Sequence, residues 1–286
     1  MQSFLYVKRE ITDTNQKGEK DMSKRLVFVL LFTMSIFITL SASVDATNNR
    51  YSWGYQMSKN EQPPYAGPKL EELLVKTGAY YRDVTEEKVL YLTFDNGYEN
   101  GFTNQILDVL QKTKVPAAFF VTGHYLNSAP ELVERMVKEG HIVGNHSWSH
   151  PDMTEISDAQ IQEELAKVQK KFEELTGVKE MNYLRPPKGV FSQRTIEVTN
   201  KLGYTHIFWS IAFLDWKPEA QKGWKYSYDK TMSQLHPGAI ILLHSISKDN
   251  AEALEKIITD ARARGYEFQS LDYFIQKKVV PPTILD

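Results

Sequence analysis

Short apolar runs alternate with helical patterns from Lys88 towards the end of the chain. The runs are rich in β-branched and aromatic residues, which is typical of buried strands. We predict strands at Val89–Phe94, Ala117–Val121, Ile142–Val143, Tyr183–Leu184, His206–Trp209, Ala239–Leu243 and Glu267–Ser270. Because strands that alternate with helices pair in parallel, the pattern predicts a single α/β domain, and seven repeats favour a (β/α) barrel. An open doubly wound sheet is the alternative, and periodicity alone does not exclude it.

Polar and small residues mark the expected ends of several helices. Ser128-Ala-Pro-Glu131 has the form of a capping box with proline in the first turn, and Gly140 follows the end of that helix. Ser157 is expected to begin the next helix. Gly177 follows this helical pattern, and Gly203 and Gly265 follow two later helical patterns.

The first 46 residues have the layout of a leader with a signal peptide. A basic segment, Met22–Arg25, precedes an apolar run, Leu26–Leu40, and small residues follow up to Ala46. The alternative is an uncleaved membrane anchor, but the apolar run is shorter than the roughly 20 residues that a spanning helix needs. We therefore expect cleavage, no stable membrane span afterwards, and an exported, extracytoplasmic protein.

The rest of the chain divides into a short irregular part and a regular one. Prolines at 63, 64 and 68 precede a short helical stretch, Leu70–Lys76. We interpret residues 47–87 as an N-terminal wrap and residues 88–286 as the main domain.

Composition narrows the chemistry. The 34 Lys and Arg nearly balance the 36 Asp and Glu, for a net charge of −2, and no basic stripe suggests a nucleic-acid partner. The chain has no cysteine, so a metal site would have to use His, Asp, Glu or Asn. We expect a monomer.

Polar residues follow the predicted strands at the points where those strands end. In a βα barrel, such positions converge on the face where the carboxyl ends of the strands meet, and that face carries the active site. The residues in question are Asp95, Asn96, His146, Arg185, Ser210 and His244.

Three of these exits suggest specific roles. His146 and His150 have the four-residue spacing that brings two imidazoles onto one face for a metal; the alternative is two exposed loop histidines. Arg185-Pro-Pro-Lys-Gly189 is a rigid turn suited to holding backbone N–H groups at an anion, or simply a tight turn with a surface arginine. His244 ends an apolar strand and is either a general acid or a core residue whose hydrogen bonds are satisfied.

Five motifs in order across Lys88–Phe274 resemble the polysaccharide deacetylase family, the NodB-homology carbohydrate esterases. Thr93-Phe-Asp-Asn-Gly97 is similar to TFDDG, His146–His150 to HSxxH, and Arg185–Gly189 to RPPxG. Asp215-Trp216 is similar to the end of the fourth motif and Leu242-Leu243-His244 to the fifth.

This resemblance implies a distorted (β/α) barrel that hydrolyses the N-acetyl group of an amino sugar. It implies that Asp95 is the general base, oriented by Arg185, and that His244 protonates the departing amine. It also implies that His146 and His150 bind a divalent cation, zinc or a similar ion. Amide hydrolysis independently needs an activated water and an acid for its poor leaving group.

Two positions depart from the family pattern. Asn96 stands where the family has its third metal ligand, an aspartate, and a neutral amide attracts a cation less strongly. We therefore expect a divalent metal that is weakly or partially bound. Ala212 stands at the first aspartate of DxxDW, so we expect His244 to lack its usual carboxylate partner.

Within the family, FDNGYENG, FFVTGH, RPPKGVFS and HPGAI resemble the delta-lactam-biosynthetic de-N-acetylases of spore-forming bacilli. The leading hypothesis is deacetylation of N-acetylmuramic acid in peptidoglycan glycan strands, a step toward the muramic δ-lactam of the spore cortex. The alternatives are deacetylation of N-acetylglucosamine in peptidoglycan or chitin-like glycans, and a weakly active or non-catalytic glycan-binding relative.

Lys188 suggests how the substrate would be chosen. A cation there could pair with the lactyl carboxylate that muramic acid has and N-acetylglucosamine lacks; the alternative is a solvated surface lysine. The other expected substrate contacts are Pro187, Gly189, Tyr98, Trp148 and Trp216.

Overall fold

The computed structural model describes residues 47–57 and 60–279. The signal peptide predicted within residues 1–46 lies outside this part of the chain. The described residues from Arg50 onward group into one compact unit, so the irregular segment after Arg50 belongs to the same unit as the strands.

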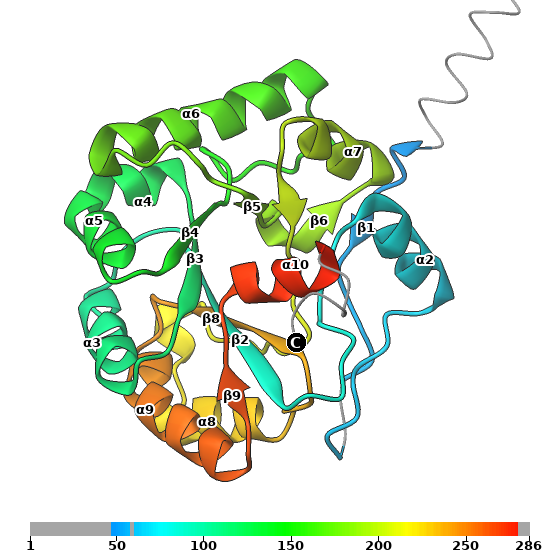
Figure 1. Cartoon of the computed structure of the whole chain (residues 1–286). Helices are drawn as coiled ribbons and strands as arrows, with labels where there is room; N and C mark the ends of the chain where they lie inside the picture. Colours follow the sequence, from blue (N-terminus) through cyan, green and yellow to red (C-terminus); the bar gives the residue numbers. More distant parts are fainter. Residues whose placement is uncertain (1–46, 58–59, 280–286) are drawn as a thin grey trace, which may run out of the picture. The chain divides into compact units, whose positions relative to one another are not determined.

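Seven parallel strands form the main sheet, which curls with helices around its outside (Figure 1). They are β2 (Val89–Asn96), β3 (Ala117–Val121), β4 (Ile142–Asn145), β5 (Tyr183–Leu184), β7 (Thr205–His206), β8 (Ala239–His244) and β9 (Glu267–Phe268). The order is β7-β5-β4-β3-β2-β8, and β9 also pairs with β2. The predicted single α/β domain with a curled parallel sheet is confirmed.

A contact between the two edges of the sheet gives it a barrel-like form. The predicted strand His206–Trp209 is shorter, since β7 ends at His206 and Ile207 then forms a bridge with Tyr80. Ile211 then forms a parallel bridge with Ile241 of β8, and Leu242 N–H donates to Ile211 O at 2.9 Å. An open doubly wound sheet would leave these edges apart.

The helices that the pattern predicted are present, although one predicted start is wrong. Their bounds are α2 (Pro68–Thr77), α3 (Thr103–Thr113), α4 (Gly123–Ser128), α5 (Pro130–Lys138), α6 (Asp158–Thr176), α7 (Gln193–Lys201), α8 (Trp224–Met232), α9 (Lys248–Ala263) and α10 (Leu271–Val279). Ser157 begins α6 as its N-cap, as predicted, and the structure shows that it forms a complete capping box with Gln160. Ser128 caps nothing, because it is itself the last helical residue of α4 and Ala129 precedes α5.

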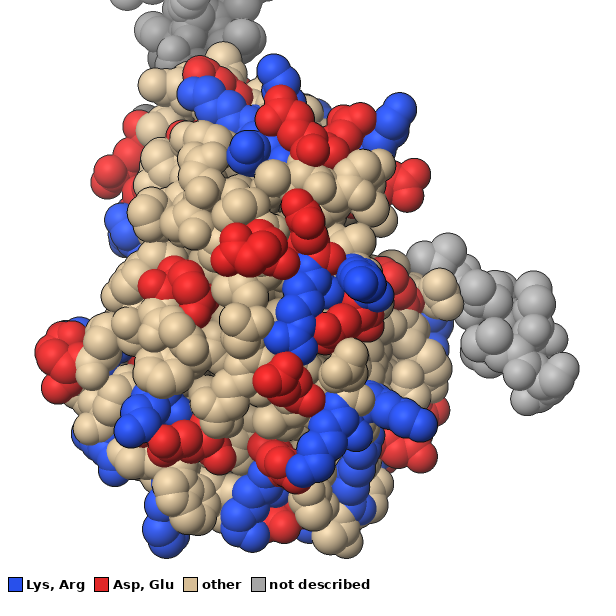
Figure 2. All heavy atoms as spheres, turned by 90° about the vertical axis from the view of Figure 1, so that its left-hand side faces the viewer, with Lys and Arg blue, Asp and Glu red and all other residues tan. Residues whose placement is uncertain are grey.

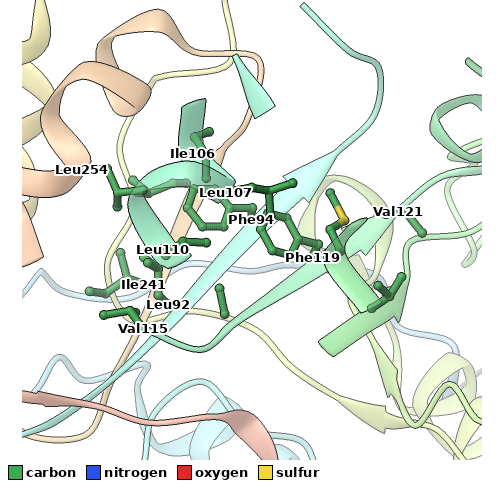
Figure 3. Packing of buried hydrophobic residues seen from close by; sticks show 14 of the residues in the cluster. Leu92, Phe94, Ile106, Leu107, Leu110, Val115, Phe119, Val121, Ile241 and Leu254 are labelled. Atoms are coloured by element: carbon green, nitrogen blue, oxygen red, sulfur yellow. The ribbon is translucent and has the colours of Figure 1, made fainter. Parts of the chain in front are cut away.

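Alternation along β2 divides the core into an outer and an inner layer. Leu92 and Phe94 pack with α3 and α9 in the outer layer, where Phe94 stacks on Phe119 with ring centroids 5.1 Å apart (Figure 3). Tyr91 belongs to a second cluster that includes Leu271 and Phe274 of α10. Successive strand residues point to opposite faces, so Tyr91, Thr93 and Asp95 share one face. The carboxylate therefore stands at the carboxyl end of the inner face.

The N-terminal segment pairs with the turn that follows β5. Strand β1 (Tyr51–Ser52) is antiparallel to β6 (Val190–Phe191), a pair that was not predicted. Trp53 N–H donates to Gly189 O at 2.7 Å, and Trp53 Nε1–H donates to Trp209 O at 3.0 Å. This segment thus supports the chain on both sides of β7.

Acidic and basic side chains intermingle on the surface shown in Figure 2. One of the ion pairs links helices, because Arg135 Nη2 of α5 lies 2.6 Å from Asp108 Oδ1 of α3. Within residues 47–57 and 60–279, no helix combines the length and apolarity needed to cross a membrane.

Gly144 of β4 provides a test of how tightly the inner layer is packed. A Cβ atom there would lie 2.7 Å from the Phe120 ring, whereas one at Gly54 would meet nothing within 4 Å. We expect Gly144→Ala to lower the free energy of unfolding by about 1–3 kcal/mol, measured by urea denaturation. Gly54→Ala is the control and should change it little. Equal stability of the two variants would contradict this packing.

Candidate active site

Asp95 and Arg185 form a buried ion pair at the carboxyl ends of β2 and β5. Arg185 Nη1 donates to Asp95 Oδ1 at 2.8 Å. Its other donors bind backbone carbonyls, Nε to Ile207 O at 3.0 Å and Nη2 to Phe208 O at 3.2 Å. The guanidinium is completely buried and lies 4.2 Å from the centroid of the Phe120 ring. Arg185 is therefore not a surface arginine, and its guanidinium fixes the position of the Asp95 carboxylate.

This pair keeps Asp95 ionised. Burial alone would raise the pKa of the Asp95 carboxyl, but Arg185, followed by His146 and His244, outweighs burial and leaves the net pKa below its ordinary value. At neutral pH the side chain is a carboxylate, which can accept a proton.

His146 and His150 lie together beside this carboxylate. Their ring centroids are 4.8 Å apart, and His146 Nε2 is 3.5 Å from Asp95 Oδ2. His146 Nδ1 is 2.8 Å from Arg185 O, a carbonyl that can only accept, so the ring proton resides on Nδ1 and Nε2 carries a lone pair. Burial lowers the pKa of both rings, that of His150 to about 4, so both are neutral at pH 7.

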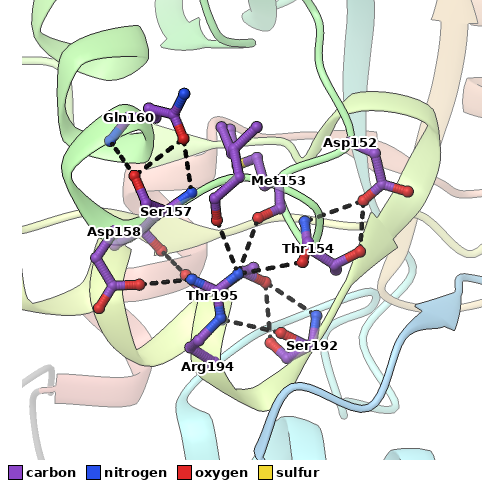
Figure 4. Close-up of polar contacts among 11 residues, drawn as sticks. Asp152, Met153, Thr154, Ser157, Asp158, Gln160, Ser192, Arg194 and Thr195 are labelled. Carbon is purple, nitrogen blue, oxygen red and sulfur yellow. Dashed lines mark hydrogen bonds and ion pairs between the residues drawn. The ribbon is translucent and has the colours of Figure 1, made fainter. Parts of the chain in front are cut away.

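The loop that carries His150 is held in an unusual conformation. Ser147 and His150 both have positive φ angles, 64° and 59°. Figure 4 shows Arg194 reaching from α7 into this loop, where Nη1 lies 2.5 Å from Asp158 Oδ1. Arg194 Nη2 donates to the carbonyl oxygens of Met153, Thr154 and Ile156 at 3.1–3.3 Å. These bonds anchor the segment after His150 to α7, and His150 N–H itself donates to Ser147 Oγ at 3.0 Å.

His244 has a carboxylate partner, so the expectation based on Ala212 is wrong. His244 Nδ1 is 2.8 Å from Asp215 Oδ1, and the backbone N–H of His244 donates to Asp215 Oδ2 at 2.9 Å. The loop after Ile211 brings Asp215, not position 212, to the end of β8. Burial alone would lower the pKa of His244, but Asp215 and then Asp95 raise it above its ordinary value.

The turn after β5 differs in part from its prediction. Gly189 N–H donates to Pro186 O at 3.1 Å, so this N–H, which was expected to face an anion, is used inside the turn. Pro187 and Gly189 are buried, and a Cβ at Gly189 would lie 2.8 Å from the Trp209 ring. Lys188 is exposed with φ 59°, and its charge helps to lower the pKa of His150. Of these residues, Lys188 is the one available to a substrate.

The predicted aromatic contacts divide into exposed and packed residues. Trp216 is 48% exposed with its ring centroid 5.5 Å from that of His244, and Tyr98 is 46% exposed on the loop after β2. Trp148 packs against Gly123, where a Cβ would lie 2.3 Å from the indole. Ser210 is fully buried, with its hydroxyl 3.0 Å from His236 Nε2.

Comparison with known proteins shows which family this chain belongs to. The family model described as polysaccharide deacetylase matches residues 82–207. A 30.6 kDa protein of Geobacillus stearothermophilus is 57% identical over 88% of this chain and 94% of its own length. The peptidoglycan-N-acetylmuramic acid deacetylase PdaA of Bacillus subtilis is 52% identical over 81% of this chain and 88% of its own. This chain belongs to the polysaccharide deacetylase family.

A solved structure extends the likeness to three dimensions. The structure of Bacillus subtilis PdaA, a family 4 carbohydrate esterase, superposes with a TM-score of 0.80 over 81% of this chain and 99% of that one. The curled parallel sheet therefore has the fold of a family 4 carbohydrate esterase.

A family metal would have an incomplete set of charged ligands here. Among the described residues, no three His, Cys, Asp or Glu side chains form a metal group. Asn96 is fully buried, and neither polar atom of its amide has a hydrogen-bond partner of normal geometry in that part of the chain. The free lone pair on His146 and the neutral ring of His150 are nitrogen donors that fit a divalent cation. The Asn96 amide is the third neutral donor that the sequence predicts, and its side chain lies beside the Tyr125 hydroxyl.

Sequence reasoning missed the residues that support the site. Asn145 is fully buried before His146, and its Nδ2 donates to Leu165 O at 3.1 Å and to Tyr204 Oη at 3.0 Å. Arg194 was also missed. Two features of the sequence could have identified these residues: Asn145 is an asparagine at a strand exit, and Arg194 is an arginine in the helix that follows the RPPKG turn.

The Asp215–His244 contact yields a pH prediction. We expect Asp215→Asn to lower the pKa of His244, because the negative charge that opposes burial is removed. As the pH rises, the His244 ring of the variant would then lose its proton at a lower pH than in the unaltered protein. NMR titration of the His244 ring, assigned through His244→Gln, measures this change. Asp108→Asn is the control, and an equal pKa in both variants would refute the assignment.

Proposed function

We propose that this protein hydrolyses the N-acetyl group of N-acetylmuramic acid in peptidoglycan glycan strands. The observation that carries the proposal is an ionised Asp95 that lies beside His146 and His150. On the adjacent strand, β8, His244 is the register partner of Asp95 and is hydrogen-bonded to Asp215. A relative that is 52% identical is a peptidoglycan-N-acetylmuramic acid deacetylase, which supports this substrate. The leader supports an exported enzyme, and the motifs support a step toward the muramic δ-lactam of the spore cortex.

The mechanism assigns a proton transfer to each side of the scissile amide. Asp95 accepts a proton from the attacking water, because its carboxylate is held in the ionised form by Arg185. Water oxygen bonds to the acetyl carbon, and the C–N bond then breaks. His244 donates its proton to the leaving nitrogen, because Asp215 favours the protonated imidazole. Acetate and a free amine are the products.

His146, His150 and Asn96 would hold the divalent cation. A bound cation would polarise the acetyl oxygen and lower the pKa of a bound water. Three neutral donors attract a cation less than a set that includes a carboxylate, so we expect zinc or a similar ion to bind weakly.

The direct test is mass spectrometry of glycan strands stripped of stem peptides, incubated with the enzyme, with and without chelator. We expect acetyl loss on muramic acid that the chelator abolishes. Asp95→Asn should lower the rate by at least about 10²-fold, since the general base is lost. Circular dichroism checks its folding, because Arg185 is left unpaired. Acetyl loss that survives the chelator would refute the metal role. The absence of acetyl loss with any divalent ion would favour a glycan-binding relative.

Lys188 gives a separate test of substrate choice. We expect Lys188→Ala to reduce the preference for N-acetylmuramic acid over N-acetylglucosamine by about tenfold, because a charge-assisted contact to the lactyl carboxylate is lost. The measurement is kcat/KM on matched glycans. Lys179→Ala, another exposed lysine, is the control. If Lys188→Ala leaves the preference unchanged, Lys188 does not select between the two sugars.

A further inference from the structure

Asn250 is a fully buried asparagine in the first turn of α9, beside the Asp215–His244 pair. Its Nδ2 donates to Asp215 Oδ2 at 2.6 Å and to His244 O at 3.1 Å. Its Oδ1 lies 2.5 Å from Ser227 Oγ of α8. One side chain thus joins two helices, the end of β8 and the loop that carries Asp215.

The surroundings determine which way the amide faces. The Asp215 carboxylate and the His244 carbonyl can only accept hydrogen bonds, so both must face the NH₂ group of Asn250. The Ser227 hydroxyl can donate, and it faces the amide oxygen. Rotating the amide by half a turn would place its oxygen against two acceptors. The orientation is therefore unique.

This orientation determines how the Asp215 carboxylate is used. Oδ2 receives the Asn250 amide and the backbone N–H of His244, at 2.6 and 2.9 Å. Oδ1 is left for His244 Nδ1 at 2.8 Å. Because Oδ2 is held from two directions, the carboxylate cannot turn away from the imidazole. The ring keeps a proton on Nδ1 and leaves Nε2 for the substrate.

We propose that Asn250 is a positioning residue for the acid step. Its amide locks Asp215 in the orientation that fixes the His244 ring, so that Nε2 delivers its proton to the leaving amine. The catalytic part of this inference rests on the proposed function, whereas the hydrogen-bond arrangement is measurable without any substrate.

Asn250→Asp is the sharpest variant, because it keeps the shape and the acceptor toward Ser227 but removes both N–H donors. It also places a carboxylate against Asp215. The first readout is the low-field proton resonance of the His244 Nδ1–H, assigned by its loss in His244→Gln. The second is kcat and KM for acetyl release. We expect the resonance to disappear and kcat to fall about 10- to 100-fold with little change in KM.

Asn200→Asp is the control for the same chemical change at an exposed asparagine. Asn200 lies in α7, and its Nδ2 donates to Thr77 O at 2.7 Å, away from His244. It should keep both the resonance and kcat. Asn250→Ala removes the donors without adding a charge, and it serves if Asn250→Asp does not fold; we expect the same direction of change with a smaller loss.

Two outcomes would overturn the inference. One is a folded Asn250→Ala or Asn250→Asp protein that retains the Nδ1–H resonance. The other is a lost resonance with kcat unchanged, which would show that this orientation is not needed for the acid step. If the unaltered enzyme releases no acetyl group, the proposed function fails, while the resonance still decides whether Asn250 orients Asp215.

Discussion

The buried ion pair between Asp95 and Arg185 is the interaction on which the rest of the site depends. Removing one partner of such a pair costs about 3–5 kcal/mol, because an uncompensated charge stays buried. Here the guanidinium meets the carboxylate and two carbonyls, from residues 207 and 208. It therefore ties β2 to β5 and to the chain that follows β7. The same contact that stabilises the curled sheet also keeps the base ionised.

Two kinds of histidine surround this carboxylate, and their charge states differ for physical reasons. His146 and His150 are neutral because burial dominates their pKa values. The pKa of His244 lies above its ordinary value because Asp215 and Asp95 together outweigh burial. A general acid and two neutral ligands can thus occupy one site without exchanging roles.

Much of the fold could be predicted from local pattern. Strands β2, β3 and β8 are continuous apolar runs, and α6 begins at a complete capping box, so both signals lie within a few residues. The same logic failed at Ser128, because a local motif cannot reveal that its first residue already belongs to another helix. The β1–β6 pair has strands of only two residues, too short to give a periodic signal.

The sequence alone determined which polar residues stand at strand exits, because strand length and register follow from side-chain alternation. It therefore indicated Asp95, His146, Arg185 and His244 as neighbours. Only the tertiary structure decided how they are paired. Asp215 reaches His244 through a loop, and Asn250 and Arg194 act from helices whose own pattern shows only amphipathic spacing. A hydrogen bond depends on distances between segments far apart in the chain, and no local preference specifies those distances.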